Sequence, residues 1–168
     1  PKGCVGGPVR LSSGTMRYTE YDPIPSAFPI LTRRTYSSQR HFALNQNGAF
    51  GTGWSSIFDV SLAIDDHDQS AELVTESGEK VRFMMTGGGY EQVLPTGAAD
   101  LGTLVVNDSG WYEYRREPSD LSLVFDQQGR VSQLIDVRSG RVATICYDQT
   151  TGLPSEVTDS WGAVPWTI

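Results

Sequence analysis

The densest group of side chains that can do chemistry is the acidic run at residues 65–68, Asp-Asp-His-Asp. Carboxylates at a turn can bind Ca²⁺, but a calcium loop needs about 6–8 oxygen ligands at fixed spacing, a glycine and a late acidic residue. This run contains no glycine, and Glu72 and Glu76 lie at the wrong offsets to complete the ligand set. We therefore interpret residues 65–68 as a solvated turn between two strands, and predict no metal site.

Four further aspartates recur at regular positions in the last third of the chain, namely Asp126, Asp136, Asp148 and Asp159. A pair of carboxylates can perform acid–base catalysis when one of them holds a proton. Each of these aspartates, however, stands beside a glycine turn or at a strand end. An aspartate in such a place commonly accepts hydrogen bonds from backbone N–H groups, so the pattern indicates a structural role.

The sequence gives little support for a nucleophilic catalytic site or a phosphate-binding loop. Cys4 and Cys146 lie far apart in the sequence. His41 has no serine or cysteine neighbour in a known nucleophile motif. We interpret the cysteines as two ordinary thiols, since they form neither a disulfide framework nor a zinc motif. Gly87–Gly89 follows a strand, as a phosphate loop does, but the Lys-Ser/Thr pair and the helix are missing. The sequence therefore predicts a hairpin loop there, no enzyme and no cofactor.

Aromatic residues give one alternative. Exposed rings can form a sugar-binding face, and the chain has four tryptophans, at Trp54, Trp111, Trp161 and Trp166. Aromatic rings also contribute large buried areas when they pack between sheet layers. We favour packing, and keep a free-standing carbohydrate-binding β module as an alternative.

Composition narrows the possible partners. The length of 168 residues, with 38% hydrophobic residues, suits one domain. The net charge of −7 repels a phosphate backbone on average, so nucleic acid is not expected as a partner. No apolar run approaches the ~18 residues that cross a bilayer, and no charged-then-apolar leader follows Pro1. We expect no membrane partner.

The elements that position these residues repeat. Phe125-Asp126 recurs as Tyr147-Asp148, and each pair is followed by a glycine turn, an alternating strand ending in aspartate and a closing glycine. The turn glycines are Gly129 and Gly152, the aspartates Asp136 and Asp159, and the closing glycines Gly140 and Gly162, all 22 or 23 residues apart. A period near 20 residues is typical of stacked or coiled β arrays.

Strand patterns extend over the whole chain. Side chains alternate between apolar and polar at 16–22, 30–37 and 54–65, and further short strands follow at 71–75, 80–86, 90–94, 104–107 and 111–117. We predict an all-β fold of antiparallel hairpins in a coiled or stacked sheet. Residues 161–168 begin one more strand, so we expect the array to end on an open edge, which favours pairing with further strands.

These motifs resemble the YD repeats of rearrangement-hotspot (Rhs) proteins. The resemblance rests on Phe125-Asp126-x-x-Gly129-Arg130-Val131 and Tyr147-Asp148-x-x-x-Gly152-Leu153. The upstream half adds Gly7-Pro8-Val9 with Ser13-Gly14, the strand 33–38 (RRTYSS), and an element made of Gly51, Gly53, Trp54 and Asp59. Together the motifs span residues 6 to 162. The second repeat departs from the pattern, with Leu153-Pro154 where Arg-Leu is usual and a turn lengthened at Thr150-Thr151.

The resemblance implies a structural segment of a β shell that encloses a C-terminal toxic domain and helps to deliver it. The implied partners are further YD repeats, the enclosed toxin and an N-terminal delivery region or secretion spike. The implied setting is interbacterial competition through type VI secretion, with the protein in the bacterial cytoplasm before export. We expect a tether at 1–15, an N-terminal β region at 16–120 and YD repeats at 121–168. Some family members are cut near this point, so Pro1 is a candidate processing junction, and self-cleavage before Pro1 is a second alternative.

Overall fold

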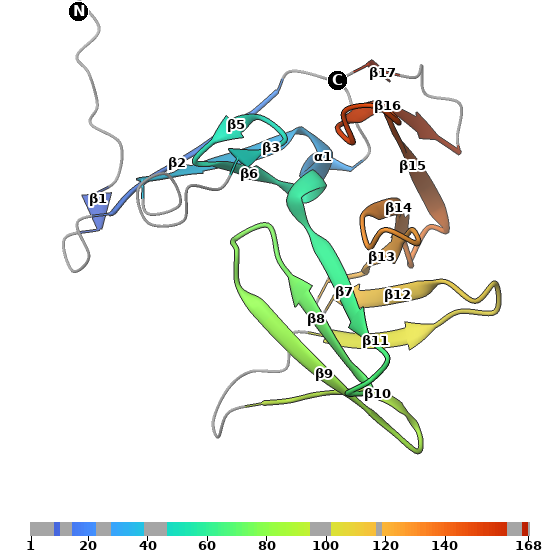
Figure 1. Cartoon of the computed structure of the whole chain (residues 1–168). Helices are drawn as coiled ribbons and strands as arrows, with labels where there is room; N and C mark the ends of the chain where they lie inside the picture. Colours follow the sequence, from blue (N-terminus) through green and yellow to red (C-terminus); the bar gives the residue numbers. More distant parts are fainter. Residues whose placement is uncertain are drawn as a thin grey trace, which may run out of the picture. The chain divides into compact units, whose positions relative to one another are not determined.

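Strands make up most of the secondary structure of the described residues. In the computed structural model we describe residues 9–10, 15–22, 28–38, 47–94, 102–116, 119–160 and 166–167. These residues belong to two compact units, residues 1–59 and residues 60–168, which we treat separately (Figure 1). Within them the predicted all-β class with antiparallel strands is confirmed. Pro1, Cys4, His41, Trp161 and Gly162 lie outside the described residues.

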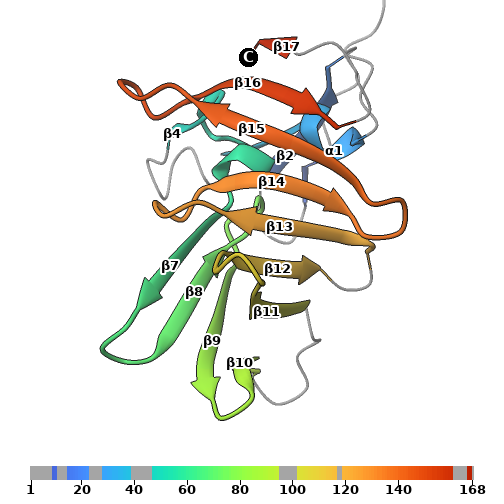
Figure 2. The same cartoon turned by 90° about the vertical axis from the view of Figure 1, so that its right-hand side faces the viewer.

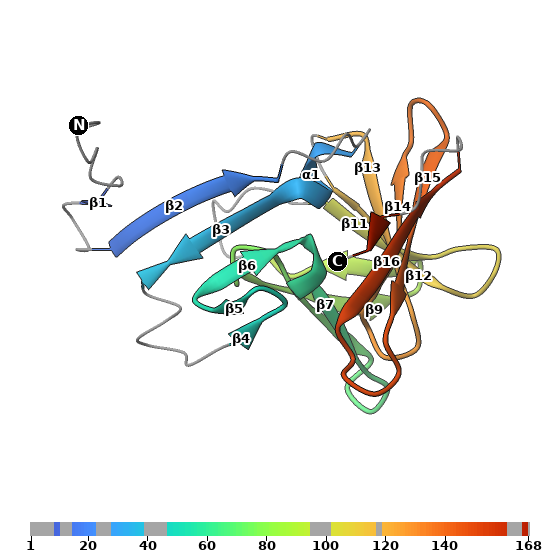
Figure 3. The same ribbon diagram turned by 90° about the horizontal axis from the view of Figure 1, so that it is seen from above.

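The first unit is a small antiparallel sheet. Its strand order is β1 (Val9–Arg10), β2 (Thr15–Tyr21), β3 (Arg33–Ser37) and β6 (Trp54–Ser56). A separate two-stranded pair consists of β4 (Asn47–Gly48) and β5 (Gly51–Thr52). Figure 3 shows β2, β3 and β6 running side by side. The predicted strand at 16–22 therefore corresponds to β2.

Two predicted strands in this part of the chain are wrong in their extent. The first half of the 30–37 strand is a short helix, α1 (Pro29–Thr32), because Pro29 fixes a helical φ at its first turn and Phe28 and Leu31 are both buried. The 54–65 strand is interrupted by a 3₁₀ turn at Ile57–Asp59. Ile57 and Phe58 are 1% and 7% exposed. Neighbouring residues of a strand point to opposite faces, whereas this turn buries both.

The second unit is one sheet in which every strand pairs with the next along the chain. Within the described residues the sheet has eleven strands. They are β7 (Ser61–Asp65), β8 (Ser70–Val74), β9 (Lys80–Thr86), β10 (Gly89–Gln92), β11 (Gly102–Val106), β12 (Tyr112–Arg116), β13 (Leu121–Phe125), β14 (Val131–Asp136), β15 (Arg141–Tyr147), β16 (Pro154–Asp159) and β17 (Trp166–Thr167). Figure 2 shows β12 to β16 stacked above one another, with β7 to β9 turned across them.

This sheet coils upon itself. Phe83 on β9 and Tyr114 on β12 are separated by two strands in the sheet order, yet their ring centroids are 6.1 Å apart. The two side chains are 0% and 1% exposed. A flat sheet would hold strands three places apart more than ~14 Å from each other. The curl therefore creates an interior, which is filled by Leu73, Phe83, Leu104, Tyr114, Leu123 and Leu134.

The coil brings its first strand back against a later hairpin. Ser61 at the start of β7 forms an isolated antiparallel bridge with Arg130, in the β13–β14 turn. The backbone N–H of Leu62 donates to the carbonyl of Gly129 at 2.8 Å. The edge strand of the sheet is thus partly covered by a turn that lies six strands further along the chain.

Candidate functional site

The hairpin turns at one end of the second unit share one design. In the β13–β14 turn the Asp126 carboxylate accepts the backbone N–H groups of Gln128 and Arg130 at 3.0 and 2.9 Å. The N–H of Gly129 donates to the Asp126 carbonyl, and Gly129 has a φ of +75°. A positive φ favours glycine because it has no Cβ to clash with the backbone.

The β15–β16 turn has the same arrangement with one residue added. The Asp148 carboxylate accepts the N–H groups of Thr150 and Thr151 at 3.0 and 2.7 Å, and Gly152 has a φ of +70°. Both hairpins also have a register shift beside the turn, between Val124 and Phe125 and between Cys146 and Tyr147. The two sequence repeats are therefore two structural repeats.

An earlier turn of the same kind joins the strands predicted at 104–107 and 111–117, a hairpin expected around Asp108-Ser109-Gly110, but the sequence analysis did not relate it to the repeat turns. In the β11–β12 turn the side-chain oxygen of Asn107 accepts the N–H groups of Ser109 and Trp111, both at 3.0 Å. Gly110 follows with a φ of +80°. Asparagine replaces aspartate here and no aromatic residue precedes it, so the aromatic-Asp pattern did not find this turn. The spacing from Asn107 to the following glycine is nonetheless the same as from Asp126 to Gly129.

The other two repeat aspartates lie at the opposite ends of these strands. Asp136 accepts the N–H groups of Arg138 and Ser139 at 2.9 and 3.0 Å. The backbone N–H of Ser139 is the main reason that the pKa of Asp136 lies below its ordinary value, and Thr151 lowers the pKa of Asp148 in the same way. Asp159 ends β16, and both of its oxygens accept from Nε of Arg141 at 2.9 and 2.8 Å. This contact raises the pKa of Arg141.

The first repeat is joined to the second through side chains. The guanidinium of Arg130 lies 4.3 Å from the centroid of the Tyr147 ring, and its Nε donates to Asp126 at 2.8 Å. The hydroxyl of Tyr147 donates to the carbonyl of Val131 at 2.8 Å. The arginine of one repeat thus holds the aromatic ring of the next. In the second repeat Leu153 takes the place of Arg130 and is 50% exposed.

Gly129 also controls the contact between the β13–β14 turn and β7. A Cβ atom at this position would lie 1.9 Å from the carbonyl oxygen of Leu62. Gly110 and Gly152 have similar φ angles but no atom within 4 Å of a Cβ position. Gly129 is therefore required both by the turn and by the approach of β7.

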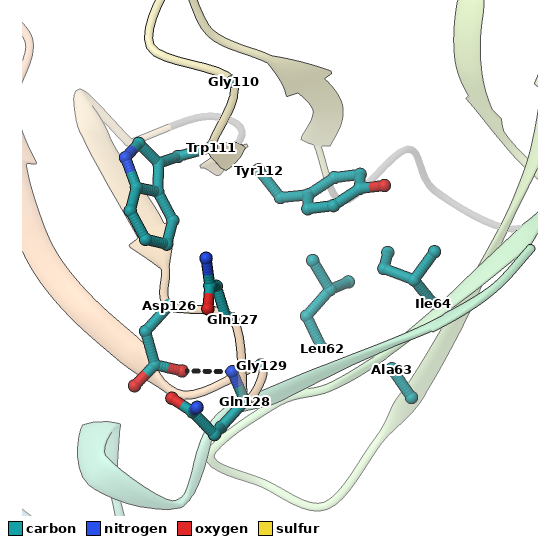
Figure 4. Close-up of a pocket in the computed structure, with 10 residues that line it drawn as sticks. All are labelled: Leu62, Ala63, Ile64, Gly110, Trp111, Tyr112, Asp126, Gln127, Gln128 and Gly129. Atoms are coloured by element: carbon teal, nitrogen blue, oxygen red, sulfur yellow. Dashed lines mark hydrogen bonds between the residues drawn. The ribbon is translucent and has the colours of Figure 1, made fainter.

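A pocket of about 360 Å³ opens beside this contact, between β7 and the β11–β12 and β13–β14 turns. Its lining includes Leu62, Ile64, Trp111, Tyr112 and Gln127. Figure 4 shows the Gln127 amide between Trp111 and Leu62. Trp111 is 38% exposed, and within the described residues the Gln127 amide has no hydrogen-bond partner.

Tyr112 in the wall of the pocket packs against a second tyrosine, Tyr90. The Tyr90 and Tyr112 ring centroids are 5.9 Å apart at an interplanar angle of 68°. Burial, followed by a hydrogen bond to Tyr112, raises the pKa of Tyr90 to about 12. Tyr90 is therefore protonated at neutral pH and can keep this hydrogen bond.

The upstream element made of Gly51, Gly53, Trp54 and Asp59 is organised by its aspartate. The Asp59 carboxylate accepts the N–H of Ala49 and the N–H of Ser56, both at 2.7 Å. Gly51 and Gly53 have φ angles of +97° and +81°. These contacts fold β5, β6 and the 3₁₀ turn around one half-buried carboxylate. The positions that define this element therefore support a local fold.

Trp54 of this element packs against two tyrosines and an arginine. Its ring centroid lies 6.4 Å from that of Tyr18 and 5.6 Å from that of Tyr36, both edge to face. The Arg34 guanidinium lies 5.4 Å from the Trp54 ring and forms ion pairs with Glu20 and Asp22. Arg34 was seen in the sequence only as part of the 33–38 strand. Its central place could not be inferred, because it depends on strand pairing across three strands.

The remaining candidates lie in ordinary structural places. Asp65 accepts the N–H groups of His67 and Asp68 at 3.0 and 3.2 Å, in an exposed turn between β7 and β8. Gly87 and Gly88 form the β9–β10 hairpin turn, and Gly89 begins β10. Cys146 is exposed with a free thiol. Among the described residues no cluster of three or more His, Cys, Asp or Glu side chains is arranged to bind a metal ion, and no helix there has the length and apolar character to cross a bilayer.

Comparison with known proteins gives one family match. Residues 6–83 match the model of a domain of unknown function, DUF6531. The match contains the element of Gly51, Gly53, Trp54 and Asp59, and it ends within β9, ahead of the repeats at 121–162. A search of the curated proteins found no match to this chain.

Proposed function

We propose that this chain is a structural segment of an Rhs-type toxin shell, which encloses a C-terminal toxic domain and helps to deliver it. Its role is to form part of the wall of this shell, and it has no catalytic activity of its own. Its partners are further YD repeats of the same protein, the enclosed toxin and an N-terminal delivery region or spike protein. The protein resides in the bacterial cytoplasm before export and acts after secretion.

The observation that carries the proposal is the coil in the second unit. One meandering sheet curls far enough for the β13–β14 turn to hydrogen-bond with β7 through Gly129 and Leu62. Beyond that contact, β14 to β16 continue the sheet with the same turns and register shifts. A sheet that closes a loop and then goes on is the geometry that a spiral wall requires. A single closed barrel would end at the contact.

The repeat contacts support the same proposal. Because Arg130 of the first repeat holds Tyr147 of the second, the first repeat presents an attachment point for its successor. In arrays of this kind stability comes mainly from nearest-neighbour contacts. Such a wall can be lengthened without a new core, which suits an enclosure of variable cargo.

The test uses the complete product of the gene that encodes these residues. We expect a C-terminal domain that resists protease in the intact protein and becomes susceptible when the wall is weakened by Gly129→Ala. The matched control is Gly152→Ala, which has a similar φ but open space at its Cβ. A gene product without a further domain, or a C-terminal domain digested equally fast in wild type and variant, would contradict the proposal.

A further inference from the structure

We infer that the outer edge of β7 and the pocket beside it form a binding site for an extended peptide. The site takes a segment with an apolar residue next to a lysine or arginine. Such a segment adds to the sheet as a short strand alongside β7. The inference does not depend on the chain being part of a shell.

The backbone of β7 supplies the first part of the site. The N–H of Leu62 points to the outer edge, where it meets Gly129. Residues two apart in a strand direct their backbone groups to the same edge, so the N–H and C=O of Ile64 also point outward. In the described part of the chain no backbone group pairs with Ile64 on this side, since β7 ends the strand order and its bridge to Arg130 is at Ser61. Ile64 can exchange two hydrogen bonds with an added strand.

The pocket supplies the second part. Leu62 and Ile64 form its aliphatic side, Trp111 and Tyr112 its aromatic side, and the free amide of Gln127 lies between them (Figure 4). The Asp126 carboxylate at its rim is occupied by backbone N–H groups and by Arg130. No unpaired charge therefore favours an ionic group in the cavity. The volume of about 360 Å³ is sufficient for one leucine, methionine or phenylalanine side chain.

The opposite face of β7 supplies the third part. A second hollow shares Ala63 and Ile64 with the pocket, and its other lining residues are Asp65, Asp66, Asp68, Ser70, Glu72 and Arg82. Glu72 is paired with Lys80 at 2.7 Å, and the other three carboxylates outnumber the one guanidinium of Arg82, so the hollow has a negative charge. Side chains of a strand alternate between the two faces of a sheet. A residue paired with Ile64 therefore places its side chain in the apolar pocket, and each of its neighbours faces the acidic hollow.

A fluorescein-labelled peptide, acetyl-Thr-Thr-Leu-Lys-Thr-Thr-amide, tests the site by fluorescence anisotropy with the 168-residue chain. We expect binding that weakens at least ~tenfold when the leucine amide is N-methylated, since this removes a backbone donor. Exchange of leucine for serine, or of lysine for glutamate, weakens binding as well. The lysine effect decreases with added salt.

Variants of the protein test the same site with the parent peptide. Trp111→Ala is expected to weaken binding at least ~tenfold, while circular dichroism and thermal melting stay close to wild type because Trp111 is an exposed turn residue. Leu153→Ala, in the corresponding position of the β15–β16 turn, is the control and leaves binding unchanged. The inference is overturned if the N-methylated peptide binds as well as its parent, if Trp111→Ala has no effect, or if glucose or N-acetylglucosamine binds while no peptide does.

Discussion

At the scale of single residues, each hairpin turn depends on one polar side chain that accepts backbone N–H groups. Asp126, Asp148 and Asn107 fill this place in three turns, and the asparagine shows that the acceptor oxygen, rather than the charge, is the common requirement. The negative charge of the aspartate is used where an arginine follows in the turn, since Arg130 donates to the Asp126 carboxylate. Of the four recurring aspartates, Asp126, Asp136 and Asp148 accept backbone N–H groups in this way.

The charge of Asp148 nonetheless makes stability depend on pH. The pKa of Asp148 lies below its ordinary value of 3.8, chiefly because Thr151 donates its N–H to the carboxylate. The charged form therefore stabilises the folded state above pH ~4, and this contribution is lost as pH falls through the lowered pKa. Asp148→Asn keeps the acceptor and removes the titration. We expect the free energy of unfolding of this variant, measured with urea, to fall less below pH ~4 than that of wild type. Parallel curves of unfolding free energy against pH for the two proteins would contradict the assignment.

The contact between repeats can be measured with a double-mutant cycle. Arg130→Ala removes the ion pair to Asp126 and the stacking on Tyr147, at an expected cost of about 1–2 kcal/mol. Combined with Tyr147→Leu, it is expected to show a coupling energy of about 1 kcal/mol in urea unfolding. Arg138→Ala is the control, since Arg138 and Asp120 are 81% and 53% exposed and their pair contributes little. Additive effects of Arg130→Ala and Tyr147→Leu would show that the repeats are not coupled here.

At the scale of elements, the sequence predicted the strands and turns well where the side-chain alternation and the spacing of the turn glycines agree. The glycine spacing of 121–160 predicted β13 to β16, because each turn needs its own glycine and cap. Alternation alone was misleading at 54–65, where Asp59 draws the chain into a 3₁₀ turn through contacts to Ala49 and Ser56. The approach of β7 to Gly129 could not be predicted, since it arises from the accumulated curl of the strands between them.

The coil makes a specific prediction for one glycine. Alanine at Gly110, Gly129 or Gly152 adopts a left-handed conformation at a cost of about 1–2 kcal/mol. At Gly129 its Cβ would also lie 1.9 Å from the Leu62 carbonyl oxygen. We expect Gly129→Ala to lower the free energy of unfolding by about 1–3 kcal/mol more than Gly152→Ala does. Amide hydrogen exchange at Leu62 should also accelerate. Equal effects of the two substitutions would show that β7 and the turn do not depend on each other.

At the scale of the whole molecule, the second unit combines a filled interior with a sheet that continues past its point of closure. Phe83 and Tyr114 fill the coil, and Gly129 joins β7 to the β13–β14 turn. The sheet continues through β14 to β17 after that contact. We propose two roles for this architecture, namely a wall that further repeats extend and a β7 edge that an extended peptide can join.

The most direct test is cryo-electron microscopy of the complete gene product. The account predicts a hollow particle whose wall contains β7 to β16 in one continuous sheet, with the β13–β14 turn against β7 and further repeats hydrogen-bonded beyond β16. It also predicts density for a domain inside the wall. A self-contained module made of these residues alone, with no sheet continued from β16 and no enclosed domain, would contradict it.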